Sequence, residues 1–280
     1  MKLIRYALLP AALLGLSACT AVKLGIPEEF SSQATELHVK GLNGFTINQK
    51  LTFGGYGTSK VRNGWVMTRE NTDRVSEVTT EDRVLKLFNV DNSVKSTSAH
   101  TKYQYSMYGD GLESKIFCLE RKSSEDQDIR THIKGLGDLS VARNYQYSFS
   151  AAILPLIQDH DLPWQVVIYN NYEAKKDTAR RLFDLPYVQE EGYATNGKET
   201  IKIRTIRTKK ATTSKGRSVN MPVKMPAGYE FSIDGGVVGI LDTYQNNVWL
   251  YNELDKETRF ILASISSAIL LRKLNQESDQ

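Results

Sequence analysis

The stretch YEFSIDGGVVGILDTYQNNVWLY, residues 229–251, decides the fold class of this chain. Apolar and polar residues alternate in its segments, which is typical of strands with one buried face. Asp234-Gly235-Gly236 interrupts the stretch once, and Gln245-Asn246-Asn247 interrupts it again. Residues of these types favour the tight turns of β-hairpins. The stretch therefore predicts three antiparallel strands that are joined by two short turns.

Similar patterns upstream extend the predicted sheet. Residues 103–107 alternate toward the turn Gly109-Asp110-Gly111, and residues 112–119 return from that turn. Residues 192–208 predict a further hairpin across Asn196-Gly197. Other strands are expected at residues 45–53, 60–68, 144–154 and 164–170. The strands therefore follow one another as hairpins and meanders, which favours an antiparallel arrangement.

The end of the chain has the pattern of one long helix. Asn252 or Asp255 can cap it, and residues 256–274 contain neither Gly nor Pro. Its apolar residues form a wide face, namely Phe260, Ile261, Ile265, Ala268, Ile269 and Leu271. The uninterrupted apolar stretch is too short for a membrane span, so we expect this helix to cover one face of the sheet. Shorter helices are expected at residues 80–88, 124–134 and 173–183. The predicted fold is a β-rich α+β fold, with antiparallel sheets and a long C-terminal helix packed on the sheet.

The first residues of the chain have the three parts of a secretory signal peptide. Lys2 and Arg5 supply positive charge, and residues 6–16 form an uncharged, mostly apolar run. Leu16-Ser17-Ala18 then precedes Cys19. The apolar run is shorter than the roughly 20 residues that a transmembrane helix needs. The segment therefore predicts export from the cytoplasm.

Leu16-Ser17-Ala18-Cys19 resembles the bacterial lipobox, in which a leucine and two small residues precede an obligatory cysteine. The resemblance implies that the Cys19 thiol receives a diacylglyceryl group, that a dedicated peptidase cuts after Ala18, and that the new amine is acylated. Stable anchoring takes more than one acyl chain, and lipid on Cys19 would meet that requirement. The alternative is an ordinary signal peptide with a cysteine close to the cleavage site.

The resemblance implies a division into a signal peptide over residues 1–18, a lipidated tether over 19–35 and a single β-rich domain over 36–280. Polar segments near 91–98 and 209–221 leave a subdivision of that domain open. The expected partner is a membrane of the cell envelope, through the lipid on Cys19. Thr20 stands where an Asp favours inner-membrane retention in Gram-negative cells. In such a host the expected location is therefore the outer membrane.

Composition narrows the classes of function. Loss of Lys2 and Arg5 with the signal peptide leaves 34 of the 36 basic residues against 32 acidic ones. This balance does not indicate a nucleic-acid-binding protein. The chain has two cysteines, Cys19 and Cys118, so lipidation of the first excludes an intramolecular disulfide. Cys118 lies in an apolar strand pattern, which favours a buried thiol over a reactive nucleophile.

The sequence contains no local motif of a catalytic or metal centre. The chain after Cys19 has no Gly-x-Ser-x-Gly, Ser-x-x-Lys or His-Glu-x-x-His motif. Its four histidines, His38, His100, His132 and His160, are widely spaced. We therefore expect no metal and no cofactor, and the pattern favours a protein that is not an enzyme. A catalytic site assembled from residues distant in sequence would leave no such signal.

A basic segment covers residues 198–217, where Glu199 is the only acidic residue. Lys202 and Arg204 alternate with isoleucines, so a strand would place both cations on its outer face. The candidate contact residues for an anionic partner are Lys202, Arg204, Arg207, Lys209 and Lys210. The partner would be an envelope protein, an anionic lipid or an acidic glycan. The alternative is a solvated hairpin whose cations prevent edge-to-edge aggregation.

The sequence favours a non-enzymatic lipoprotein of the cell envelope, with a binding or structural role at the periplasmic face or the cell surface. The alternative is an envelope hydrolase whose site is assembled from residues distant in sequence.

Overall fold

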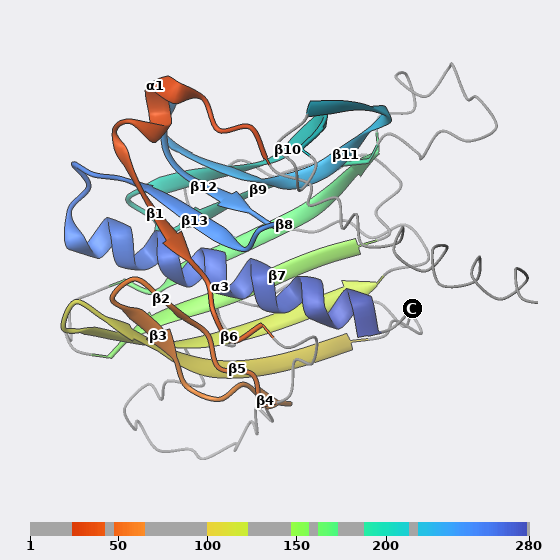
Figure 1. Ribbon diagram of the computed structural model, residues 1–280. Coiled ribbons are helices and arrows are strands. Elements are labelled where there is room, and N and C mark those ends of the chain that lie inside the picture. The colour runs from red at the N-terminus through yellow and green to blue at the C-terminus, as the bar shows by residue number, and fades with distance from the viewer. Residues whose placement is uncertain are drawn as a thin grey trace, which may run out of the picture.

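The computed structural model describes residues 24–42, 48–64, 100–122, 147–156, 162–172, 188–212 and 218–278. One antiparallel sheet of 13 strands curves around the long helix α3 (Lys256–Ser278), and the short helix α1 (Glu28–Ser31) lies outside it (Figure 1). In chain order the strands are β1 (Ala34–His38), β2 (Thr52–Phe53), β3 (Tyr56–Thr58), β4 (Arg62–Asn63), β5 (His100–Gly109), β6 (Leu112–Lys122), β7 (Tyr147–Pro155), β8 (Trp164–Tyr172), β9 (Val188–Thr195), β10 (Thr200–Thr212), β11 (Ser218–Ile233), β12 (Gly236–Asp242) and β13 (Asn247–Tyr251). The β-rich α+β class predicted from the sequence is confirmed. The signal peptide, Cys19 and the three shorter predicted helices lie outside the described residues.

The strands from β5 to β13 lie side by side in chain order, as expected for a meander. β1 pairs with β13 at one edge, while β3 and β2 continue the sheet beyond β5 at the other. The two edges meet at a single bridge between Lys40 and Thr52. The Lys40 amide donates to the Thr52 carbonyl at 2.8 Å, and the Thr52 amide donates back to the Lys40 carbonyl at 3.1 Å. The sheet is therefore joined into a ring at this point.

The predicted hairpin turns are confirmed by their backbone geometry. Asp110 and Gly111, between β5 and β6, have φ angles of 53° and 76°. Asp234 and Gly235, between β11 and β12, have φ angles of 50° and 85°. Two successive positive φ angles characterise the type I′ turn, whose twist matches that of the flanking strands. The Asp-Gly pairs thus set the register of both hairpins.

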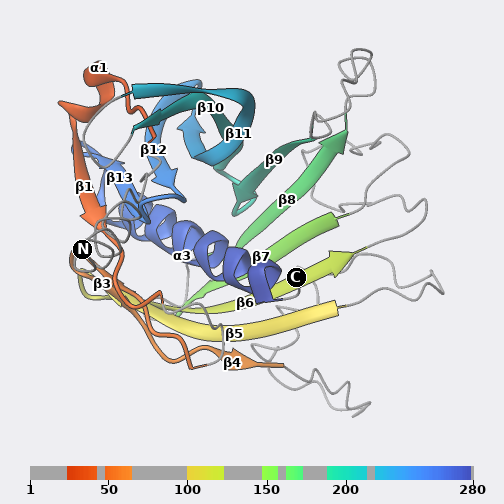
Figure 2. The same cartoon turned by 45° about the vertical axis from the view of Figure 1, so that its right-hand side comes forward.

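Helix α3 lies inside the curved sheet, with strands on several sides of it (Figure 2). Every residue from 260 to 272 is buried, as expected of a helix that is enclosed all round. The sequence predicted a helix packed on the sheet, which is confirmed, but also that it would cover one face. The sheet instead wraps around the helix. Neither helix of the described part of the chain combines the length and apolar character needed to span a bilayer.

Hydrogen bonds compensate for the polar groups that α3 buries. Ser264 donates to the Phe260 carbonyl, and Ser267 donates to the Ser264 carbonyl, both at 2.8 Å. From β5, the Tyr105 hydroxyl lies 2.7 Å from the Ser267 hydroxyl, and Tyr103 donates to a carbonyl of α3 at 3.1 Å. Buried hydroxyl groups are tolerated when they are bonded in this way. These two tyrosines therefore belong to the core.

A second, smaller apolar cluster covers the outer face of β10–β13. Leu24 is buried there against Ala227 and Ile240, and Phe30 of α1 and Ile206 of β10 pack on the same cluster. The described fold therefore already includes residues 24–35, which the sequence assigned to the tether. Residues 24–30 are held against this outer face.

Candidate functional site

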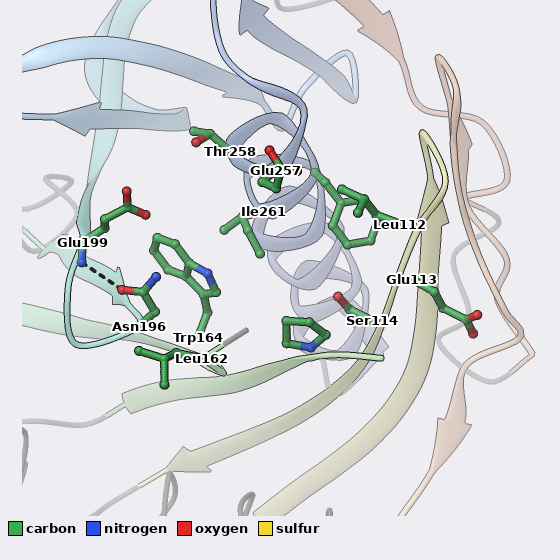
Figure 3. Close-up of a pocket in the computed structure, with 12 residues that line it drawn as sticks. Leu112, Glu113, Ser114, Leu162, Trp164, Asn196, Glu199, Glu257, Thr258 and Ile261 are labelled. Carbon is green, nitrogen blue, oxygen red and sulfur yellow. Dashed lines mark hydrogen bonds between the residues drawn. The ribbon is translucent and has the colours of Figure 1, made fainter. Parts of the chain in front are cut away.

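The structure has a pocket of about 180 Å³ at the N-terminal end of α3 (Figure 3). The start of β6, the end of β7, the start of β8, the β9–β10 turn and the first turns of α3 form its walls. Several of these segments are distant in sequence, and they meet because the sheet curves around the helix. Concave sites of this kind, held by regular elements, are the usual binding sites for small molecules.

Side-chain hydrogen bonds hold the β9–β10 turn in place. The Asn196 carboxamide oxygen accepts the backbone amides of Lys198 and Glu199 at 2.9 and 2.8 Å. The Thr195 hydroxyl donates to the Glu199 carbonyl at 2.6 Å. Asn and Thr favour such turns because their side chains replace backbone hydrogen-bond partners. The backbone of Glu199 is therefore fixed, while its exposed side chain stands at the pocket rim.

Asp255, one of the two caps that the sequence allowed, fixes the opposite side of the pocket by capping α3. It accepts the Thr258 amide at 2.8 Å and the Thr258 hydroxyl at 2.7 Å. Burial raises the pKa of the Asp255 carboxyl, but the hydrogen bonds from Thr258 outweigh burial and hold this pKa below its usual value. The cap sets the first turn of the helix, so Glu257 lies at the rim and Ile261 lies in the wall.

The floor of the pocket contains an unusual polar group, the hydroxyl of Ser114. Alternation along β6 places Ser114 on the inner face together with Ile116 and Cys118. Its side chain is 1% exposed, and its hydroxyl has no hydrogen-bond partner within the described part of the chain. Figure 3 shows this oxygen pointing into the pocket. An unsatisfied buried hydroxyl costs about 1–3 kcal/mol, so the pocket floor favours an occupant that can bond to it.

Apolar and polar residues line the pocket in equal number, and the charged ones are all negative. Trp164 is 8% exposed, and its indole ring lies beside Ile261 in the close-up of Figure 3. The lining carboxylates are Glu113, Glu199 and Glu257, and no Lys or Arg lines this pocket of the described structure. Figure 3 shows Glu113 pointing away from the pocket. The carboxylates of Glu199 and Glu257 therefore stand at the rim of a small pocket with a hydroxyl at its base.

The predicted basic contact residues lie on β10 but do not form one continuous cationic surface. Lys202 and Arg204 are exposed on the outer face, because Ile201 and Ile203 point into the core. Arg204 forms an ion pair with Glu230 of β11 at 2.7 Å. Part of the positive charge of this face is therefore balanced by a neighbouring strand.

The remaining predicted contact residues lie beyond an irregularity in the β10–β11 pairing. Arg207 is half-buried and donates to the Lys224 carbonyl at 2.9 Å. Lys209 is exposed, whereas the side chain of Lys210 lies outside the described part of the structure. The paired ends of β10 and β11 include part of the polar segment 209–221, where the sequence left a domain boundary open.

A buried polar cluster lies toward the other end of α3. Arg272 is 3% exposed and donates to Glu190 of β9 at 2.7 Å and to the hydroxyl of Tyr229 on β11. The Tyr229 hydroxyl donates to the same carboxylate. Burial raises the pKa of Tyr229 well above its usual value, so this phenol stays protonated. The cluster joins three elements, and its members are too distant in sequence for a local pattern to reveal it.

Cys118 is fully buried, as the sequence predicted, and burial raises the pKa of its thiol well above the usual range. A thiol of this kind is a poor nucleophile at neutral pH. In the described ranges, no three His, Cys, Asp or Glu side chains come together as a metal-binding group. Cys19 itself lies outside the described residues.

Sequence patterns did not indicate the pocket. Trp164 was expected as a strand residue, and Glu199 was noted only as the single acid of a basic segment. The signals that do exist are the Asn196-Gly197 turn and the Asp255 cap, which place Glu199 and Glu257 at the ends of their elements. Comparison with known proteins found no matching family model, no matching curated protein and no matching solved structure.

Proposed function

We propose that this chain is a lipid-anchored, non-enzymatic binding protein of the bacterial cell envelope, which contacts anionic groups close to its own anchor. The lipobox residues Leu16-Ser17-Ala18-Cys19 support the anchor. The observation that carries the contact is the position of Leu24, which is buried on the outer face of the sheet beside β10–β12. Leu24 is five positions after Cys19 in the sequence, and five residues span at most about 18 Å.

This short connection supports a defined orientation of the anchored protein. Lys202 and Arg204 share the outer face of β10 with Ile206, which packs on the Leu24 cluster. The same face therefore holds residues 24–30 and the exposed cations Lys202 and Arg204. Each Lys or Arg near an anionic membrane surface contributes about 1 kcal/mol. The proposed partners are anionic lipid headgroups or acidic glycans of the membrane that holds the anchor.

The anchor is tested with the variant Cys19→Ser. We expect this variant to lose incorporation of labelled fatty acid and to accumulate as an uncleaved precursor, since the lipobox thiol is the acceptor. Normal cleavage together with membrane retention would contradict lipidation at this residue.

The contact surface is tested with the double variant Lys202→Glu/Arg204→Glu in the lipidated protein. We expect the outer face of β10 to contact anionic vesicles more weakly in this variant. Hydrogen exchange of the vesicle-bound protein measures this as a loss of protection of the β10 amides. The matched control is Lys50→Glu/Lys60→Glu, which changes the net charge equally at exposed positions near β2–β4. Equal protection in both double variants would show that β10 is not the contact surface.

A further inference from the structure

We propose that the pocket at the N-terminal end of α3 binds a small organic cation, namely a primary amine on a short aromatic or apolar body. This site is separate from the outer face of β10, and it goes beyond the proposed membrane contact. Three features of the pocket carry the inference, and each corresponds to one part of such a ligand.

The rim of the pocket selects the charge of the ligand. Glu199 and Glu257 are both exposed at the opening of the pocket. Glu199 lies in the β9–β10 turn, and Glu257 lies in the first turn of α3. No basic residue lines this pocket of the described structure. The local potential is therefore negative, which attracts an ammonium group and repels a carboxylate or phosphate.

The walls select an apolar or aromatic body. Trp164 and Ile261 face the pocket, and Leu162 beside them is 42% exposed. An exposed leucine next to a nearly buried indole gives the opening an apolar surface that a ligand can cover. An indole ring also stabilises a nearby cation through its π-electrons. The volume of about 180 Å³ suits a single ring or a short chain rather than a polymer segment.

The floor selects a hydrogen-bonding group at the inner end of the ligand. The Ser114 hydroxyl is buried, points into the pocket and has no partner in the described residues. A hydroxyl group can donate or accept, so a ligand hydroxyl at this depth would satisfy it. The structure thus specifies a ligand with an ammonium group at the rim, an apolar body and a polar inner end.

Tyramine is a probe with this arrangement, and isothermal titration calorimetry of the full chain in non-ionic detergent measures its binding. We expect saturable binding of tyramine. Phenethylamine lacks the hydroxyl group and should bind about fivefold more weakly, because a buried hydrogen bond is lost. 3-(4-Hydroxyphenyl)propionate carries a carboxylate in place of the ammonium group and should show no measurable binding.

Variants assign these preferences to residues. Glu199→Gln/Glu257→Gln should weaken tyramine binding by about tenfold. Each exposed ion pair between a glutamate and the ammonium group is weak, and this variant removes both pairs. Glu28→Gln/Glu29→Gln on α1 is the matched control, because it removes two exposed carboxylates that do not line the pocket, and it should leave binding unchanged. Ser114→Ala should abolish the preference for tyramine over phenethylamine. Circular dichroism checks that each variant is folded.

Each contrary result overturns the inference at a defined point. Equal binding of tyramine and its carboxylate analogue would show that the pocket does not select a cation. Equal effects of the paired variant and Glu28→Gln/Glu29→Gln would show that the cation binds elsewhere. Absence of binding by all three probes would remove the site itself. None of these results bears on the anchor or on β10, which are tested with other variants.

Discussion

Arg272 and Arg204 form ion pairs of the same length in different surroundings. Each donates to a glutamate at 2.7 Å, but the side chains of Arg272 and Glu190 are 4% and 18% exposed, whereas those of Arg204 and Glu230 are 62% and 23% exposed. The Arg272 guanidinium also lies 5.5 Å from the Phe149 ring centroid. Solvent screens the exposed pair, and the buried pair is screened much less.

The replacement Arg272→Met is therefore expected to lower the free energy of unfolding by about 3 kcal/mol, because it leaves the Glu190 carboxylate buried without its ion pair. Arg204→Met should cost less than about 1 kcal/mol. Urea unfolding of both variants measures the difference. The double variant Arg272→Met/Glu190→Gln should recover part of the loss, and similar losses in both single variants would contradict this account.

Individual elements were predictable from the sequence where local chemistry controls them. The type I′ turns follow from Asp110-Gly111 and Asp234-Gly235, and the start of α3 follows from Asp255. The enclosure of α3 was not predictable, because Ser264 and Ser267 resemble residues of a polar helix face. A serine can bond to a carbonyl of its own helix, so these residues are buried at little cost. Local periodicity cannot distinguish these two environments.

A glycine within β9 lies too close to the neighbouring strand to carry a side chain, which gives a prediction. A Cβ atom at Gly192 would lie 2.2 Å from the Val167 carbonyl oxygen of β8. We expect Gly192→Ala to destabilise the protein by about 2 kcal/mol or more, since the neighbouring backbone must move. Gly236→Ala at the start of β12 is the control, because its Cβ would meet its nearest neighbour at 3.6 Å. Thermal unfolding compares the two, and equal shifts in Tm would exclude steric crowding as the cause.

In the whole molecule, the helix and the ring of strands depend on each other. Residues 260–272 of α3 are buried among strands, so their amides cannot reach water unless the sheet opens. We expect these amides to exchange with solvent only through global unfolding, whereas β2 and β4, two residues long at the edge, exchange faster. Hydrogen exchange followed by mass spectrometry measures this order. Faster exchange in α3 than in β2 would show that the helix leaves the interior independently.

Contacts between separate elements were the hardest features to predict from the sequence. The bridge between Lys40 and Thr52 joins the β1 edge of the sheet to the β2 edge. β1 pairs with β13 and β2 pairs with β3, and β13 and β3 are far apart in the chain. The pocket likewise needs Ser114, Trp164, Glu199 and Glu257 to come from four separate elements. Such contacts arise from the curvature of the complete sheet, and no spacing within one segment encodes them. The fold class could therefore be predicted, but the site could not.

The position of α3 after all the strands has a consequence for the time at which the protein can fold. Synthesis proceeds from the N-terminus, so every strand leaves the ribosome before the helix that fills the ring. Until residues 260–272 emerge, the inner face of the sheet has no partner for its apolar side chains, and a stable core cannot form. We expect this delay to keep the nascent chain unfolded while it is being made. In the proposed export from the cytoplasm the chain would cross a membrane in extended form, and this order of synthesis would favour that step.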